Sequence, residues 1–389
     1  MRTHVEKGIL HMAARQRAAI VGVHNTRQAR HLPEETSDSI TFKAVRGALA
    51  DAGLTFADVD GYSVVPGFDA HSRASGLFGY SVGNTMFWAG SGRIGPAAVN
   101  EAAQVIEAGG ATTVVVASGQ AGLLTDTTAV APWTRPANEY VQCFGLMTPA
   151  EWALSAQEYI WRFGTKPEEL AYIASVIRNN GHRNPEAVYY GRGPYTVEDI
   201  LASRMVASPY RLLECATVGE GGSALVLTTL ERARDLVQKP VEILGHAFET
   251  WGGIYQQPQT YDRVRDWGRT SGDKAFAMAG LQREDVDVFE FYDNFSWEII
   301  RYFESLGYCG EGEGAQFVAD GAIESDGRYP ICTDGGVMAH SHTGISQLLQ
   351  KVVQGVRQIR GTSAANQVPG AEIALVANLG EVTLLGPAS

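Results

Sequence analysis

Apolar positions in the first half of the chain form alternating strand and helix patterns. Short runs of apolar and β-branched residues at 18–23, 61–65 and 113–117 are typical of buried strands. Between them, apolar residues at 40–52 and 93–108 recur every three to four positions, as on the buried face of an amphipathic helix. The pattern predicts a β-α-β-α-β unit in which helices cover a sheet.

The same pattern returns in the second half, and a sequence repeat accompanies it. The segment A-G-L-T-F-A-D-V-D at 52–60 recurs as A-G-L-Q-R-E-D-V-D at 279–287, which is 227 residues further along (279 against 52). An internal repeat of this kind indicates a duplicated structural unit. The elements predicted in the second copy are strands at 241–244, 288–292 and 373–377 and a strongly apolar helix at 345–359.

We expect the chain to consist of two such halves, 18–238 and 239–389. Residues 1–17 are mildly basic and lack a long apolar core, so we interpret them as a disordered leader, with Met12 as an alternative start. Between about 120 and 210 the first half carries an insertion that the second lacks. We interpret this insertion as a helical cap with its own small core, as the wall of an apolar pocket, or as both. Its aromatic residues are Trp133, Tyr140, Phe144, Trp152, Tyr159, Trp161 and Phe163.

Composition limits the classes of function. The chain has 389 residues, of which 45% are hydrophobic and 19% charged, a balance typical of an ordered globular protein. Its formal net charge of -12 offers no electrostatic surface to nucleic acid, nor to an anionic membrane without a further anchor. No apolar run approaches the roughly 20 residues that span a bilayer. We therefore expect no nucleic-acid partner and no membrane partner.

The cysteines are few and scattered. None of the four forms a C-x-x-C pair, so the sequence predicts no metal site. Dispersed thiols in a chain of this length fit a reducing compartment, and we expect a cytoplasmic protein in which each thiol is a small buried apolar group. The four are Cys143, Cys215, Cys309 and Cys332.

Four segments resemble the motifs of one known family. E-C-A-T-V-G-E-G-G-S-A-L-V-L at 214–227 is similar to its D-C-x-x-x-x-D-G-A-A-A stretch, and F-Y-D-N-F at 291–295 to its H-D-C-F or N-E-A-F motif. G-G-V-M-A-H-S-H-T-G at 335–344 is similar to its G-G-x-x-x-x-G-H-P-x-G motif, and Q-V-P-G-A-E-I-A-L-V at 367–376 to the approach to its closing strand. From about 17 to 385 the chain thus resembles the thiolase superfamily, and within it the sterol-carrier-protein-X thiolases and their lipid-transfer-protein relatives. The resemblance implies an α/β fold of duplicated βαβαβ halves, layered as an α-β-α-β-α sandwich with an inserted loop domain.

The sequence departs from that family at the residues that carry its chemistry. The resemblance places a nucleophilic cysteine at the start of the first central helix, where a helix N-terminus lowers the pKa of a thiol. Here the segment F-W-A-G-S-G-R-I-G at 87–95 has Gly92 at that position and Ser91 beside it. The second family cysteine, in a glycine-rich turn after the last strand, is also missing from A-N-L-G-E-V at 377–382. Acyl transfer through a thioester on the enzyme is therefore not expected.

Two ring side chains remain at the positions of the reaction centre. Tyr292 is the first residue of Y-D-N-F and stands at the carboxyl end of a predicted central strand, where α/β folds place their sites. His342 matches the family histidine, although the local sequence is S-H-T, and it precedes the apolar helix. We predict that Tyr292 and His342 are catalytic, with His340 as a further candidate. The positions assigned to an oxyanion or CoA-binding site are Gly92, Gly335, Gly336 and Gly380.

These groups suit carbon–carbon cleavage without a covalent enzyme intermediate. A β-hydroxyacyl-CoA can break between Cα and Cβ by a retro-aldol reaction when a base removes the hydroxyl proton and hydrogen-bond donors stabilise the thioester enolate. We assign the base role to His342 and a proton relay to Tyr292, because a free imidazole has a pKa of about 6.5 and a free phenol one of about 10. The reverse assignment stays open.

One side branch of the family resembles this chain further. Lipid-transfer-protein-type aldolases that cleave steroid or bile-acid side chains attached to CoA lack the cysteine and carry tyrosine in the motif that is Y-D-N-F here. This resemblance implies an acyl-CoA substrate and a homodimer bound to a small OB-fold, zinc-ribbon partner as a heterotetramer. It implies no cofactor bound by the chain itself, because CoA enters as part of the substrate.

Three alternatives stay open. An acyltransferase or Claisen enzyme would use Ser91 as its nucleophile. An acyl-CoA or sterol-binding protein would keep the fold without the chemistry, with Tyr292 only filling the space of the family histidine. A structural subunit would serve to activate a partner. A shorter branched acyl group would explain the aromatic insertion as well as a steroid does.

Overall fold

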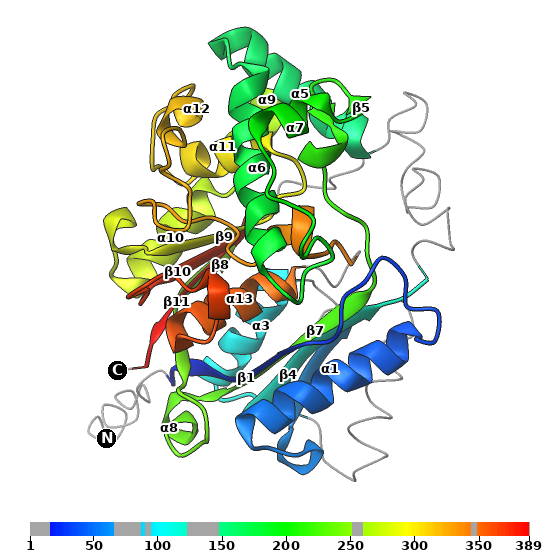
Figure 1. The fold of residues 1–389 in the computed structure, drawn as a ribbon. Helices are drawn as coiled ribbons and strands as arrows, with labels where there is room; N and C mark the ends of the chain where they lie inside the picture. Colours follow the sequence, from blue (N-terminus) through cyan, green and yellow to red (C-terminus); the bar gives the residue numbers. More distant parts are fainter. Residues whose placement is uncertain are drawn as a thin grey trace, which may run out of the picture.

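The computed structural model describes residues 16–65, 87–89, 95–122, 148–250, 260–343 and 348–388. Its main strands are β1 (Ala18–Asn25), β2 (Gly61–Val65), β3 (Trp88–Ala89), β4 (Thr113–Gln120), β7 (Gly221–Thr229), β8 (Val241–Phe248), β9 (Val288–Phe291), β10 (Ala374–Asn378) and β11 (Glu381–Pro387). Within the described residues they form one mixed sheet of nine strands, in the order β3-β2-β4-β7-β1-β8-β11-β10-β9 (Figure 1).

The two halves occupy opposite ends of this sheet. β2 and β4 pair in parallel in the first half, as β9 and β10 do in the second. Each half also contains an antiparallel strand that the sequence pattern did not predict, β7 between β4 and β1 and β11 between β10 and β8. The halves join where β1 pairs with β8, through Ala19 opposite Glu242 and Ile20 opposite Val241. The duplication is therefore confirmed, with more strands in each half than expected.

Helices cover both faces of the sheet, two of them between its two halves and two on the outer faces. α3 (Gly95–Glu107) and α13 (Leu349–Arg360) pack against each other at the centre, in an apolar cluster that includes strand residues of both halves. α1 (Ser37–Ala52) covers the outer face of the first half and α10 (Arg269–Ala279) that of the second. This is the expected α-β-α-β-α layering (Figure 1).

Glycine allows each outer helix to approach its strand closely at a matching place in the two halves. A Cβ on Gly22 of β1 would clash with the carbonyl oxygen of Ala48 on α1. A Cβ on Gly245 of β8 would clash in the same way with the carbonyl oxygen of Ala275 on α10. Because glycine has no Cβ, it tolerates this backbone approach. The same glycine–helix contact in both halves is further evidence of the duplication.

A helical cap covers one end of the sheet (Figure 1). The insertion of the first half lies between β4 and β7 and forms part of this cap. In the second half the corresponding strands, β10 and β11, are joined by a tight turn, so the insertion is absent there, as expected. The second half adds helices from another place, between β9 and α13. The cap elements are α5 (Thr148–Phe163), α6 (Pro167–Arg183), α7 (Val197–Ala202), α9 (Tyr261–Val264), α11 (Trp297–Ser305), α12 (Gly314–Phe317) and the hairpin of β5 (Met205–Ala207) with β6 (Tyr210–Arg211).

The cap has no separate apolar core among the described residues, contrary to one interpretation of the insertion: its buried residues form one apolar cluster with residues of β9, β10, β11 and α10. The rings of Tyr159 and Trp297 lie 5.8 Å apart, and Trp152 is 2% exposed. Trp161, by contrast, is 83% exposed. The aromatic residues of the insertion that lie outside the described residues are Trp133, Tyr140 and Phe144.

The predicted boundary near residues 238–240 falls between α8 (Leu230–Ala233) and β8. The division into an N-terminal and a C-terminal half at that point stays a prediction. None of the helices among the described residues is both long and apolar enough to cross a membrane.

Candidate active site

Tyr292 and His342 meet at the carboxyl end of the second half of the sheet. Tyr292 directly follows β9, and its backbone N–H donates to the carbonyl of Ala377 on β10 at 3.0 Å, which continues the parallel pairing. The backbone N–H of His342 donates to the carbonyl of Thr217 at 2.7 Å. These contacts bring the Tyr292 hydroxyl to 3.1 Å from Nε2 of the half-buried His342. One proton can pass between a phenol and an imidazole at this distance.

The turn before His342 is held by a buried ion pair. Residues 336–340 form a single π-helical turn. The carboxylate of Asp293, next to Tyr292 in sequence, accepts the backbone N–H groups of Val337 and Met338, each at 2.9 Å. Lys351 of α13 supplies the counter-charge, with Nζ 2.6 Å from Asp293 Oδ1. Asp293 therefore couples the position of Tyr292 to that of the turn that leads to His342.

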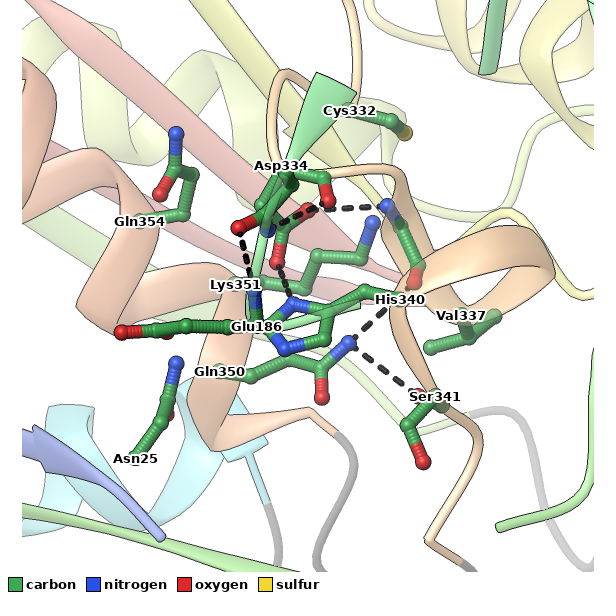
Figure 2. A network of polar contacts seen from close by, with 12 residues as sticks. Asn25, Glu186, Cys332, Asp334, Val337, His340, Ser341, Gln350, Lys351 and Gln354 are labelled. Carbon is green, nitrogen blue, oxygen red and sulfur yellow. Dashed lines mark hydrogen bonds and ion pairs between the residues drawn. The ribbon is translucent and has the colours of Figure 1, made fainter. Parts of the chain in front are cut away.

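His340 belongs to a second buried pair in the same network (Figure 2). Its Nδ1 lies 2.6 Å from Asp334 Oδ2, and its side chain is fully buried. Burial raises the pKa of the Asp334 carboxyl, but His340 and Lys351 outweigh it and lower that pKa to about 2. Burial and the nearby charge of Asp334 raise the pKa of Glu290 on β9 to about 8, against the effect of Lys351. At neutral pH the network thus contains a protonated Glu290 beside an ionised Asp334.

Comparison with known proteins places the chain in a family. A family model described as thiolase C-terminal domain-like matches residues 255–384. The chain is 34% identical over 375 residues to the 17-hydroxy-3-oxo-4-pregnene-20-carboxyl-CoA lyase of Mycobacterium tuberculosis, covering 92% of this chain and 95% of that protein. This chain belongs to the thiolase superfamily.

Two further relatives of this thiolase-superfamily chain are informative. It is 33% identical over 371 residues to the steroid side-chain-cleaving aldolase of Thermomonospora curvata, covering 89% of this chain and 91% of that one. Among solved structures it is similar to the Ltp2-ChsH2(DUF35) aldolase, with a TM-score of 0.83 and 29% identity over 96% of this chain and 98% of that chain. The fold expected from sequence is confirmed by this likeness.

The assignment of Gly335 and Gly336 to an oxyanion or CoA-binding site stays a prediction, and the structure shows what surrounds the two residues. The N–H of Gly335 donates to the carbonyl of Cys332, and that of Gly336 to Asp334 Oδ1. Both residues have positive φ angles, and a Cβ on Gly336 would clash with the Asp293 carboxylate. In this thiolase-superfamily chain, internal packing therefore explains both glycines, and their N–H groups are already donated within the protein.

Of the remaining candidate residues, Gly380 lies within the described residues, whereas Ser91 and Gly92 do not. Gly380 lies in the turn between β10 and β11, so the turn precedes the last strand and does not follow it as the sequence analysis supposed. A Cβ there would meet the carbonyl oxygen of Glu249. Ser91 and Gly92 lie outside the described residues, as do residues 344–347 between His342 and α13. Their predicted roles stay predictions.

The described thiols are poor nucleophiles. Burial raises the pKa of Cys215 to about 12 and that of Cys309 to about 12, with a smaller contribution from neighbouring carboxylates. Burial also raises the pKa of Cys332 well above its ordinary value. A thiol reacts as the thiolate, so these three groups are inert at neutral pH. Cys143 lies outside the described residues.

Sequence reasoning missed the buried charges around the site. Glu290 lies in the apolar strand V-F-E-F, and Lys351 lies in the apolar helix α13. A single charged residue within an apolar segment was the feature of the sequence that could have indicated them. Fully buried charges are rare without a partner. Within the described ranges, no three His, Cys, Asp or Glu side chains are placed to hold a metal ion.

Proposed function

We propose that this chain is an aldolase that cleaves the Cα–Cβ bond of a β-hydroxyacyl-CoA. The observation that carries the proposal is the contact of 3.1 Å between the Tyr292 hydroxyl and His342 Nε2, in a chain whose described thiols are all held protonated. The pair offers acid–base catalysis, whereas a thioester on the enzyme would need an ionised thiol.

In the proposed reaction no group is consumed. His342, through Tyr292, takes the proton of the substrate's β-hydroxyl. The oxygen forms the new carbonyl, the Cα–Cβ bond breaks, and its electron pair passes to the thioester as an enolate. The enolate is then protonated at Cα, which releases a shortened acyl-CoA and a ketone or aldehyde. The reverse assignment, with Tyr292 as base and His342 as donor, uses the same contact.

The relatives support a steroid as the acyl group. The name of the Mycobacterium tuberculosis lyase places a hydroxyl on the ring carbon C17 and the carboxyl-CoA on C20, the side-chain carbon attached to C17. That hydroxyl is β to the thioester carbonyl, as a retro-aldol reaction requires. We propose the same substrate class here, with CoA as part of the substrate and no cofactor bound by the chain itself.

A protein partner is part of the proposal. The name of the similar solved structure, Ltp2-ChsH2(DUF35) aldolase, joins two proteins. We propose that this chain forms a homodimer that binds a small OB-fold, zinc-ribbon protein as a heterotetramer. Co-expression followed by size measurement in solution tests this, and a chain that remains alone at micromolar concentration would contradict it.

The decisive experiment uses the chain purified with its co-expressed neighbours. It is incubated with a β-hydroxyacyl-CoA that carries a bulky ring substituent, and products are identified by mass spectrometry. We expect a shortened acyl-CoA and a ketone or aldehyde in equal amounts. Binding without turnover would overturn the aldolase proposal in favour of a binding protein, and a trapped acyl group on Ser91 would overturn it in favour of an acyltransferase.

A further inference from the structure

Tyr189 lies between two arginines beside the turn that leads to His342. The guanidinium carbon of Arg178 is 4.3 Å from the centre of the Tyr189 ring, and that of Arg192 is 5.1 Å away. The backbone N–H of Tyr189 donates to the carbonyl of Ala339 in the turn at 3.2 Å. The cluster is therefore fixed to the candidate active site through the backbone.

Arg178 is a buried cation that has no carboxylate partner among the residues described. It is fully buried on α6, and its three hydrogen bonds go to the carbonyls of Leu213 and Cys215 and the hydroxyl of Thr217, at 2.8 to 3.0 Å. Burying a charge is costly unless an opposite charge accompanies it. The arrangement leaves a positive potential in the protein beneath Tyr189.

Two exposed arginines add to this potential. Arg192 follows Tyr189 closely in sequence, and Arg30 is brought near by the bridge between Ala29 and Glu220. Neither has a carboxylate partner in the described part of the chain. Burial raises the pKa of the Tyr189 phenol, but Arg178, a hydrogen bond with Thr217, and both exposed arginines together lower it below its ordinary value. All three cations therefore act on one point of a protein whose net charge is -12.

We infer that Arg30, Arg192 and Tyr189, above the buried charge of Arg178, form a binding site for a phosphate group. Guanidinium groups bind phosphate through paired, charge-assisted hydrogen bonds, and the Tyr189 ring lies against the guanidinium groups of Arg178 and Arg192. The inference rests on the proposed function, since it takes the phosphate to be one of those of CoA.

The position of the site fits a CoA thioester. Thr217 accepts a hydrogen bond from Arg178 on its hydroxyl and one from the His342 N–H on its carbonyl. Thr217 thus links the proposed phosphate site to the Tyr292–His342 pair through hydrogen bonds. A single extended ligand can place its phosphates on the exposed arginines and its thioester at Tyr292 and His342.

The test is direct binding by calorimetry with CoA, 3′-dephospho-CoA and a pantetheine thioester. In Arg30→Gln/Arg192→Gln we expect CoA to bind roughly ten- to a hundredfold more weakly, since each charge-assisted hydrogen bond contributes about a factor of ten or more. Binding of the pantetheine thioester should not change. The control Arg46→Gln/Arg204→Gln removes two exposed arginines outside the cluster and should leave both affinities within about twofold. Arg178 is left intact, because its removal threatens folding.

The two sources of phosphate are distinguished by 3′-dephospho-CoA. If the double variant still weakens its binding, the pyrophosphate occupies the site; if the effect disappears, the 3′-phosphate does. Equal losses for CoA and the pantetheine thioester, or no loss for CoA, overturn the inference. Because binding is measured without turnover, an enzyme that binds CoA through these arginines but cleaves no substrate would contradict the proposed function alone.

Discussion

The hydroxyl of Tyr292 lies 3.1 Å from Nε2 of His342, although fifty residues separate them in sequence. The two come from different elements, one from the end of β9 and the other from the strand-like segment beside Thr217. An imidazole nitrogen can donate or accept, so the same contact serves with either residue as the base.

Replacing Tyr292 by Phe removes the hydroxyl and retains the ring. We expect kcat for carbon–carbon cleavage to fall by about 10²- to 10⁴-fold, the usual contribution of a positioned acid or base. The melting temperature should barely change. The matched control is Tyr308→Phe, because the buried Tyr308 hydroxyl has no hydrogen-bond partner among the described residues. Full activity in Tyr292→Phe would remove Tyr292 from the mechanism.

The double variant Tyr292→Phe/His342→Gln tests whether the two residues act as one unit. Groups that share one proton transfer are strongly non-additive, so we expect the double variant to be no slower than the worse single variant, within about threefold. Steady-state kinetics on all four proteins gives the coupling. If the two losses multiply instead, the residues act in separate steps.

The Asp293–Lys351 pair should contribute strongly to stability. Lys351→Met leaves a buried carboxylate without its cation, and we expect the free energy of unfolding to fall by about 3–5 kcal/mol in urea. Asp293→Asn/Lys351→Met removes both charges and should be less destabilised than the single variant. The control Lys43→Met breaks an exposed ion pair with Glu35 and should lower the free energy of unfolding far less than Lys351→Met does. Equal effects at the two lysines would contradict the buried network.

Glu290 should make the protein less stable as pH rises toward 8. Its pKa is raised from the ordinary 4.5 to about 8, so between these values the folded chain holds a proton that the unfolded chain has lost. Stability therefore falls with increasing pH across that window. Glu290→Gln keeps an oxygen for Thr333 and should flatten the profile of urea midpoints between pH 5 and 8. Exposed Glu372→Gln should retain the wild-type slope; if Glu290→Gln retains it too, Glu290 ionises normally.

Much of the fold could be predicted because the chain repeats itself. The parallel strands β2, β4, β9 and β10 and the central helices have clear apolar periodicities and a shared A-G-L motif. β7 and β11 were missed because β7 begins with two glycines and β11 ends with glycine and proline, residues that are depleted in strands. Both pair antiparallel, which a repeated β-α-β pattern does not suggest.

The two candidate catalytic residues could be predicted from the sequence, whereas the buried charges around them could not. Tyr292 stands at the end of a predicted strand, and the resemblance to the thiolase superfamily implies the role of His342. Asp293, Lys351 and Arg178 could not be predicted, because burial of a charge depends on which distant segment supplies its partner. The close packing around Gly335 and Gly336 could not be predicted either, because the groups that they contact, Gly181 and Asp293, come from elsewhere in the chain.

The protonated state of Cys215, Cys309 and Cys332 should make the protein resistant to oxidation. Peroxide attacks thiolates and converts them stepwise into sulfenic and sulfinic acids, so a thiolase that depends on a reactive cysteine is exposed to this damage. A reaction carried by a phenol and an imidazole offers peroxide no such target. We expect this protein to retain its turnover after hydrogen peroxide treatment that inactivates a cysteine-dependent thiolase.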